Sequence, residues 1–330
     1  MRVVCYGVRE TEVPYFNNLN KYNYDLVLVP ELLNHDNVKV AEGANAVITR
    51  GNCKADAQNM AVLAGYGVEY VLTRTVGYNH VDIAAGVKHG FKMARVSEYS
   101  PNAIAELAVT LAMMLVRNTA YTVNKTKNKD FRVDAQMFSK EIRNCTVGII
   151  GVGKIGLTTA KLFKGLGAKV VAYDIYESDE AKEVVEFMSQ EELLKVSDVV
   201  SIHMPWIKGQ NDKVINREFI DLMKDDAILI NTSRGEVQDD DAIYEALTTG
   251  KLQSFGTDVF AREAEFFFKD MTGLDLPYEP AEKLLNLYPQ VLVTPHMGSY
   301  TDEALTNMIE MSYDNINDFV TTGECCNELK

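Results

Sequence analysis

Short apolar runs alternate with segments of helical pattern through the first hundred residues of the chain. The runs are rich in branched and aromatic side chains and are bounded by polar residues, which is typical of buried strands. They are RVVCYGV, YDLVLVP, NAVIT and EYVLTRT. Helical segments fit between them, such as ADAQNMAVLAG, which ends on a glycine suited to a helix C-terminus. The alternation predicts a parallel sheet flanked by helices.

A second alternation begins at Thr146. Its six candidate strands are TVGIIG, KVVAYD, DVVSIHMP, AILINTS, SFGTDVF and QVLVTPH. Helices fit between most of them, and in SQEELLKVS the residues Ser189 and Glu192 have the spacing of a capping box. Six strands with intervening helices predict an α/β protein with a doubly wound parallel sheet of the dinucleotide-binding type.

The segments outside these two alternations suggest how the chain is divided. YSPNAIAELAVTLAMMLVRNT has Ser100 as a cap and Pro101 at the first helical position, and its apolar length suits a buried helix that connects two domains. The polar stretch that follows is expected to form an arm or a helix and loop on the surface. The last helical segment ends at Gly323. A chain of 330 residues exceeds what one core usually serves, so we expect two domains.

Charge and cysteine content narrow the classes of partner. The formal net charge is −14, from 33 basic and 47 acidic residues, and no basic stripe stands out. This argues against a nucleic-acid or anionic-membrane binder. The five cysteines are irregularly spaced and predict no metal site. With no long apolar span and no signal-peptide pattern at the N-terminus, we expect a cytoplasmic protein.

The glycines after the first strand of the second alternation predict a cofactor site. In TVGIIGVGKIG, Gly151 permits a tight turn, Gly153 allows a pyrophosphate to approach, and Gly156 allows close packing of helix on strand. Asp174 ends the next strand, where a carboxylate binds the ribose hydroxyls, and no arginine follows to accept a 2′-phosphate. NAD is therefore predicted rather than NADP. Further expected contacts are Lys154, Ile155, His203 and Thr232.

Four polar residues follow later strands of the same alternation: Arg234, Asp258, Glu263 and His296. The carboxyl ends of parallel strands meet at one edge of a sheet, so these side chains are expected to converge. Reduction of a 2-oxo acid needs a cation for the carboxylate and a proton donor for the carbonyl oxygen. Arg234 suits the first role, and His296 with Glu263 suits the second.

The motifs TVGIIGVGKIG…AYD, INTSRGE, GTDVFARE and TPHMGSYTDEA resemble the D-specific 2-hydroxyacid dehydrogenase family over essentially the full length. The stretches CYGVRE, TRGNC and YSPNAIAELAVT are similar to the branch with D-lactate and (R)-2-hydroxyisocaproate dehydrogenases. Within it they are most similar to the (R)-2-hydroxyglutarate dehydrogenases of amino-acid-fermenting anaerobes. The resemblance implies a Rossmann NAD domain over 101–299 and a flavodoxin-like substrate domain from 1–100 plus 300–330.

The resemblance also assigns roles to residues. It implies that Arg234 binds the carboxylate and carbonyl of the substrate, that His296 paired with Glu263 is the acid–base, and that Asp258 contacts the nicotinamide side. Substrate contacts are implied for the backbone amides near Val76 and Gly77 and for Tyr99 and Tyr300. The family further implies a homodimer joined through the NAD domains, to which the 120–145 segment contributes.

Arg50, which follows the strand NAVIT, is the residue on which the predicted substrate depends. A second guanidinium suits the far carboxylate of 2-oxoglutarate, whereas the alternative interpretation is local pairing or general anion binding. D-lactate, (R)-2-hydroxyisocaproate or phenyllactate dehydrogenase activity stays open, as does an NAD-sensing binding protein. The chain departs from the family in two places. Tyr78 stands where a small polar residue is commoner and is expected to narrow the cleft, and the Phe266–Phe268 run is either a substrate lid or part of the packing.

Overall fold

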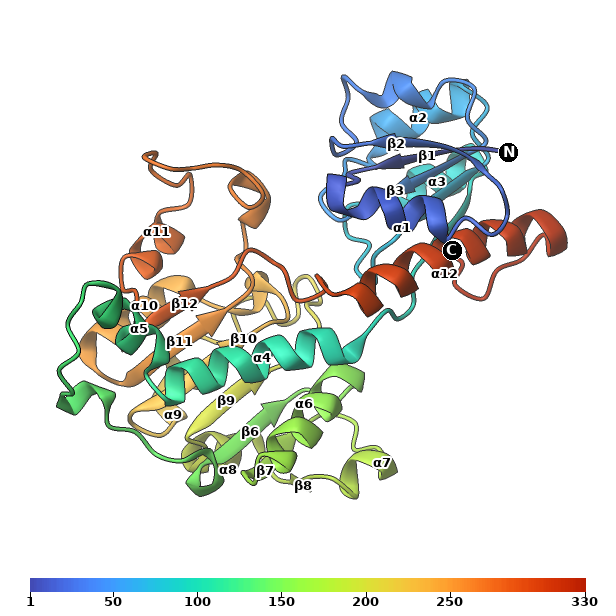
Figure 1. Ribbon diagram of the computed structural model, residues 1–330. Coiled ribbons are helices and arrows are strands. Elements are labelled where there is room, and N and C mark those ends of the chain that lie inside the picture. The colour runs from blue at the N-terminus through green and yellow to red at the C-terminus, as the bar shows by residue number, and fades with distance from the viewer. The chain divides into compact units, whose positions relative to one another are not determined.

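The computed structural model describes residues 1–330, and the chain forms two compact units. The first unit consists of Met1–Ser100 and Ser299–Lys330, and the second of Pro101–Gly298. Each unit is a parallel sheet with helices on both faces (Figure 1). The chain enters the second unit at the helix that begins with Pro101 and leaves it one residue before the expected boundary at 300.

The first unit has five parallel strands in the order β2-β1-β3-β4-β5, which is the flavodoxin-like order. The strands are β1 (Arg2–Tyr6), β2 (Asp25–Val29), β3 (Ala46–Thr49), β4 (Tyr70–Thr73) and β5 (Lys92–Arg95). The first four are the strands predicted from the apolar runs. The fifth was not predicted, because a four-residue strand with a cation at each end carries too little apolar pattern.

Alternate residues of β1 supply two separate cores, one on each face of this sheet. Val3 and Cys5 pack with α1 (Val13–Asn18) and α12 (Asp302–Thr322), whereas Val4 and Tyr6 pack on the other side. That other face is covered by α2 (Ala57–Gly65) and α3 (Ile83–His89). The C-terminal helix α12 thus packs on one face of the sheet formed by the N-terminal strands.

The second unit has seven parallel strands in the order β12-β11-β10-β9-β6-β7-β8. Counted from β6, this is the Rossmann order 3-2-1-4-5-6 with a seventh strand added beside the sixth, which confirms the predicted doubly wound sheet. The strands are β6 (Thr146–Ile150), β7 (Lys169–Tyr173), β8 (Glu186–Phe187), β9 (Val199–Ile202), β10 (Ala227–Asn231), β11 (Leu252–Thr257) and β12 (Val291–Val293). The two-residue edge strand β8 was not predicted.

Helices cover both faces of the second sheet. One core contains the packed pair α4 (Pro101–Val116) and α6 (Lys154–Gly165), together with α5 (Thr119–Lys127) and α7 (Asp179–Lys182) (Figure 1). The other contains α8 (Gln190–Val196), α9 (Arg217–Leu222), α10 (Asp240–Thr249) and α11 (Glu279–Leu285). No single helix is long and apolar enough to cross a membrane; one pair, α4 and α5, meets those criteria together but is bent by 67°.

The predicted capping box is present at the start of α8. The Ser189 hydroxyl accepts a hydrogen bond from the Glu192 amide at 3.3 Å, and the Glu192 carboxylate accepts one from the Ser189 amide at 3.1 Å. Two amides that the helix leaves without partners are satisfied in this way, and both leucines of the helix are then buried on the sheet.

We expect Ser189→Ala to lower the free energy of unfolding of the second unit by about 1 kcal/mol, because the amide at the start of α8 loses its acceptor. Urea unfolding followed by circular dichroism measures the change. Ser189→Asp, which supplies another capping oxygen, should retain most of the stability. Equal stability of Ser189→Ala and the unaltered protein would contradict this role.

Candidate active site

The glycine turn between β6 and α6 leaves room for a diphosphate. Gly151 has φ +89°, and a Cβ there would lie 2.7 Å from the backbone of His203. A Cβ at Gly156 would lie 1.9 Å from the Gly151 carbonyl oxygen, so helix and turn touch at this point. Gly153 caps α6, and a Cβ there would meet no atom within 4 Å. The N-terminus of α6, which begins with Lys154 and Ile155, therefore adjoins open space.

Two polar groups beside this turn fit a dinucleotide. Asp174, directly after β7, accepts hydrogen bonds from the backbone amides of Val152 at 2.5 Å and Tyr176 at 3.0 Å, so its carboxylate is fixed beside the glycine turn. At the end of β10, the hydroxyl of Thr232 is buried without a hydrogen-bond partner in the protein. A buried hydroxyl without a partner is costly, which is consistent with a ligand there.

His203 packs within the fold beside the same turn. Its Nε2 lies 2.9 Å from the Ser201 hydroxyl, and burial lowers the pKa of the imidazole to about 3. The ring is therefore neutral at physiological pH. Its backbone and Cβ are the atoms that Gly151 and Gly156 approach, so His203 shapes the turn.

The turn after β12 is held by Asp258. Its carboxylate accepts hydrogen bonds from the Thr294 hydroxyl at 2.5 Å and from the amides of Met297 and Gly298, both at 2.9 Å. The carbonyl of Asp258 accepts from the amide of His296, which stands at φ +49°. Burial raises the pKa of Asp258, and these bonds oppose that effect. Asp258 therefore orients the backbone that carries His296.

His296 and Glu263 form the pair predicted from the sequence. Nδ1 of the imidazole lies 2.5 Å from Oε1 of Glu263, and the second carboxylate oxygen accepts from the Phe260 amide at 3.2 Å. The histidine side chain is 38% exposed and the glutamate 16%, so the pair has one open end. With Nδ1 held by the carboxylate, Nε2 is the ring nitrogen that can exchange a proton with a ligand.

Arg234 lies on the tight turn after β10. A Cβ on Gly235 would lie 2.0 Å from the backbone of Phe260, so the turn after β10 is pressed against the one after β11. Glu236, which the sequence analysis missed, lies within electrostatic reach of Arg234, Glu263 and His296. Burial and the charge of Glu263 raise the pKa of Glu236, whereas the charges of Arg234 and His296 oppose the rise. The Arg234 guanidinium donates to the Ser233 carbonyl at 2.7 Å, and its charge reaches Glu236 as those of Glu263 and His296 do.

In the first unit, the turn after β4 presents backbone amides. The Val76 carbonyl accepts from Nη1 of Arg95 at 3.0 Å, and the Gly77 carbonyl accepts from the Thr75 hydroxyl at 2.6 Å. Because a peptide group is planar and trans, fixing the Val76 carbonyl directs the amide of Gly77 to the opposite side. The amides of Val76 and Gly77 donate to no acceptor in the protein. Anion binding is what such amides can do.

Tyr78, a departure from the family pattern, lies on this turn with its ring 5.1 Å from the guanidinium of Arg95. His80 is held nearby by the Thr73 hydroxyl at 3.0 Å, and burial lowers the pKa of its imidazole to about 4. His80 is therefore neutral at physiological pH and holds the turn against β4.

Three arginines of the first unit lie near one carboxylate. Arg74 is 2% exposed and donates to Glu12 at 2.8 Å and to the Gly7 carbonyl at 2.8 Å, while Arg9 donates to the other Glu12 oxygen at 2.9 Å. Burial lowers the pKa of Arg50 to about 10, with the charges of Arg9 and Arg74 acting in the same direction. We call these four residues, Arg9, Glu12, Arg50 and Arg74, the arginine cluster.

Both predicted tyrosines belong to the first unit. Tyr300 is about half exposed; its ring lies under the guanidinium of Arg9, 4.6 Å from the centroid, and its hydroxyl is 3.0 Å from that of Thr11. Tyr99 is partly buried, and its backbone carbonyl accepts a hydrogen bond from the side-chain Nδ2 of Asn307 at 2.5 Å. Tyr300 thus extends the surface of the arginine cluster.

The Phe266–Phe268 run divides in two. Phe266 and Phe267 are buried against Phe260, with centroid distances of 5.9 and 6.1 Å. Phe268 is 47% exposed at φ +62°. The first two residues therefore pack in the core beside the turn that carries Glu263.

Comparison with known proteins identifies the family. Residues 109–298 match the family described as "D-isomer specific 2-hydroxyacid dehydrogenase, NAD binding domain". The chain is 33% identical to an aromatic 2-oxoacid reductase of Clostridium sporogenes over 99% of both chains. It is 36% identical to a D-lactate dehydrogenase of Lactiplantibacillus plantarum over 100% of this chain and 99% of the other.

A solved structure of D-2-hydroxyisocaproate dehydrogenase has a TM-score of 0.90 to this structure at 33% identity, over 100% of this chain and 99% of that one. The two sheet orders, the open glycine turn and the His296–Glu263 pair agree with this assignment. The chain therefore belongs to the D-isomer specific 2-hydroxyacid dehydrogenase family and is an NAD-dependent D-2-hydroxyacid dehydrogenase.

Proposed function

We propose that this dehydrogenase interconverts 2-oxoglutarate and (R)-2-hydroxyglutarate. The observation that carries the proposal is the arginine cluster, in which Arg9 and Arg74 donate to Glu12 and the buried guanidinium of Arg50 lies near both of them. The charges of Arg9 and Arg74 lower the pKa of Arg50 in addition to the effect of burial, so positive charge is concentrated there. Because like charges in a desolvated place repel, an anionic ligand there would relieve the cluster. The distal carboxylate of a dicarboxylic acid supplies that charge.

The proposed mechanism assigns the shared chemistry to the second unit. Arg234 binds the carboxylate and polarises the carbonyl of the 2-oxo acid, as a guanidinium does in charge-assisted pairs. Nε2 of protonated His296 donates a proton to the carbonyl oxygen as negative charge develops there, and Glu263 stabilises the imidazolium and fixes its ring. Asp174, Thr232 and the amides at the start of α6 would hold NADH, which would supply the hydride when bound.

In the first unit, the amides of Val76 and Gly77 are proposed to bind the carboxylate shared by all 2-oxo acids. Arg50, with Tyr99 and Tyr300, is proposed to recognise the remainder of the substrate. A charge-assisted pair of a guanidinium and a carboxylate is worth about 1.5–3 kcal/mol, enough to set a preference between substrates. Reduction of 2-oxoglutarate would suit amino-acid fermentation, since it reoxidises NADH.

The names of the relatives support a second candidate substrate class. The proteins described above act, by name, on lactate, aromatic 2-oxo acids and 2-hydroxyisocaproate, and none of these carries a distal carboxylate. NADH oxidation measured with 2-oxoglutarate, pyruvate, phenylpyruvate and 2-oxoisocaproate separates the candidates. A kcat/KM for 2-oxoglutarate below those of the monocarboxylates would contradict the proposal.

His296→Gln should lower kcat by about 100- to 10,000-fold, because the variant lacks the proton donor. NADH binding, followed by fluorescence, should change little, since the assigned cofactor contacts are intact. His89→Gln, at an exposed histidine of the first unit, is the control and should retain full activity. Turnover of His296→Gln near that of the unaltered enzyme would refute the assigned role.

Arg50→Gln should raise KM for 2-oxoglutarate about tenfold or more, which corresponds to the loss of one charge-assisted pair, and spare 2-oxoisocaproate. Steady-state kinetics with both substrates measure the difference. Arg2→Gln removes an exposed charge at the N-terminal end of β1, whereas Arg50 follows the C-terminal end of β3, and it should affect neither substrate. Equal losses for both substrates would mean that Arg50 serves the fold or the shared carboxylate.

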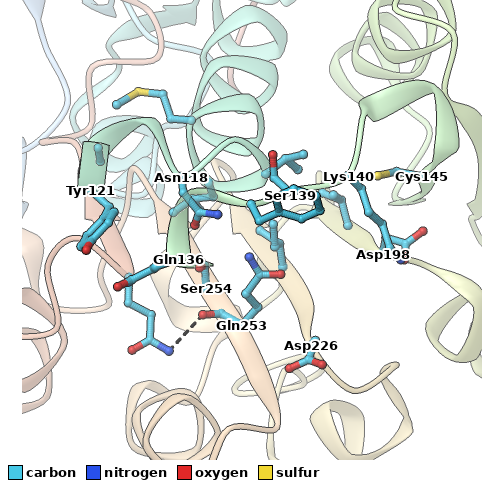
Figure 2. Close-up of a pocket in the computed structure, with 18 of the residues that line it drawn as sticks. Asn118, Tyr121, Gln136, Ser139, Lys140, Cys145, Asp198, Asp226, Gln253 and Ser254 are labelled. Carbon is cyan, nitrogen blue, oxygen red and sulfur yellow. Dashed lines mark hydrogen bonds and ion pairs between the residues drawn. The ribbon is translucent and has the colours of Figure 1, made fainter. Parts of the chain in front are cut away.

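We also propose that two copies of the chain pair through their NAD domains. A cavity of about 830 Å³ is lined by α4, α5, the following 135–140 segment and the N-terminal ends of β9, β10 and β11 (Figure 2). Nearby in the chain, Phe131, Val133 and Phe138 are 76%, 85% and 90% exposed. Exposed apolar side chains next to a cavity of this size are typical of a protein interface, and the occupant we propose is a second copy of this surface.

The double variant Phe131→Ser, Phe138→Ser should shift the protein from dimer towards monomer, because it removes apolar area from the proposed interface. Sedimentation velocity over a range of concentrations measures the shift. Leu274→Ser alters a 63% exposed apolar residue outside the 120–145 segment and should leave the mass unchanged. A monomeric unaltered protein would refute the proposal.

A further inference from the structure

A buried chain of hydrogen bonds runs behind the turn that carries Arg234. The Tyr278 hydroxyl donates to Oδ2 of Asp240 at 2.8 Å, and Oδ1 of Asp240 accepts from Nε2 of Gln238 at 2.6 Å. Oε1 of Gln238 accepts from Nδ2 of Asn231 at 2.6 Å, and the same Nδ2 donates to the Arg234 carbonyl at 2.9 Å. We call Asn231, Gln238, Asp240 and Tyr278 the relay.

The charge of Asp240 fixes the direction of every bond in the relay. An ionised carboxylate only accepts, so Gln238 must turn its amide nitrogen towards it and present its oxygen to Asn231. Asn231 must then present its own nitrogen to Gln238, and its Oδ1 accepts from the amide of Ser233 at 2.9 Å and the hydroxyl at 2.8 Å. One carboxylate therefore sets the orientation of two amides and of the Ser233 backbone.

The relay also touches the turn after β11. Nε2 of Gln238 donates to the Val259 carbonyl at 3.3 Å, directly after Asp258. On the same turn, the Phe260 amide donates to Glu263. Gln238 thus links the turn after β10, which carries Arg234, to the turn after β11, which leads to Glu263.

The burial of the relay shows how strongly the fold specifies it. Asn231, Gln238 and Asp240 are at most 1% exposed, and every polar atom of their side chains has a partner. Burial raises the pKa of Asp240 to about 6, opposed by the bonds from Tyr278 and Gln238; the charge of Asp239 adds to the rise and that of Lys213 opposes it. Apolar side chains of the same volume would fill this place at no cost in desolvation. A polar relay instead defines one backbone conformation.

We propose that Gln238, Asp240 and Tyr278 are positioning residues that hold the Arg234 turn in the conformation in which it binds the 2-oxo acid. None of them needs to touch the substrate; they act through Asn231 on the backbone of Ser233 and Arg234. The inference rests on the proposed role of Arg234 as the substrate anchor, and the experiment separates the two.

Gln238→Leu interrupts the relay at its centre. At slightly alkaline pH, where Asp240 is ionised, we expect KM for the most rapidly reduced 2-oxo acid to rise about tenfold and kcat to fall less, because a misplaced anchor weakens binding. The dissociation constant of NADH should change less than KM, since the relay contacts neither the glycine turn nor Asp174, and Thr232 is the one proposed NADH contact that adjoins it. Hydrogen exchange at the Ser233 amide should become faster, which reports the loosened turn without any substrate.

Tyr278→Phe is the milder variant and keeps the ring that packs on Phe260. It should shift KM and Ser233 exchange in the same direction by a few-fold. Added to Gln238→Leu it should have no further effect, because the relay is already interrupted. Additive effects of the two substitutions would mean that Tyr278 acts locally and would overturn the relay. Unchanged KM and unchanged hydrogen exchange at the Ser233 amide in both Gln238→Leu and Tyr278→Phe would also overturn the relay.

Arg234→Gln, assayed alongside, provides the comparison for the anchor itself. If it raises KM and Gln238→Leu does not, the positioning role is refuted while the proposed function stands. If neither changes KM, the assignment of Arg234 as the anchor fails, and with it the positioning role. If both raise KM, with faster Ser233 exchange in Gln238→Leu, the inference is supported.

Discussion

Parallel pairing of the strands is the constraint on which the candidate active site depends. In the second unit β6, β10, β11 and β12 run in the same direction, so the residues that follow them meet at one edge of the sheet. The turns at that edge are closely packed. The turn after β10 touches the turn after β11 where Gly235 meets Phe260, and the turn after β6 touches the backbone of His203 at Gly151 and the start of α6 at Gly156. Glycine is required at these contacts because a Cβ has no space. The direction of the strands therefore places the functional side chains at one edge of the sheet, whatever bonds they make with one another.

Desolvated charge is the second feature that both units share. Asp258, Asp240 and Glu12 are nearly fully buried, and each is held by several hydrogen-bond donors that offset the cost of removing a carboxylate from water. For Glu12 the charges and bonds of Arg74 and Arg9 outweigh burial and lower the pKa. Each of these carboxylates holds a turn or a guanidinium in place. None of the three has the open end that His296 and Glu263 have.

The sequence predicted the architecture because the necessary signals are local. Strand runs, the Ser189 capping box and the glycine turn are each contained within a few residues, and ten of the twelve strands follow from them. The edge strands β5 and β8 were not predicted, because β5 has a cation at each end and β8 has only two residues. Partnerships over long separations were also missed. Glu12 pairs with Arg74 and Asp240 with Tyr278, and nothing in the sequence near one residue indicates the other. Arg95 was missed because its strand was.

The family assignment and the substrate depend on different parts of the chain. The match to the NAD-binding domain covers 109–298 and contains Arg234, Glu263 and His296, which serve any 2-oxo acid under the proposed mechanism. The arginine cluster lies outside that segment, on the turns after β1, β3 and β4 of the first unit. Relatives with about a third of their residues in common can therefore share hydride transfer and still act on lactate, aromatic acids or isocaproate. Under the proposed mechanism, the shared residues of the second unit carry out the reaction, and the arginine cluster of the first unit selects between a dicarboxylic and a monocarboxylic substrate.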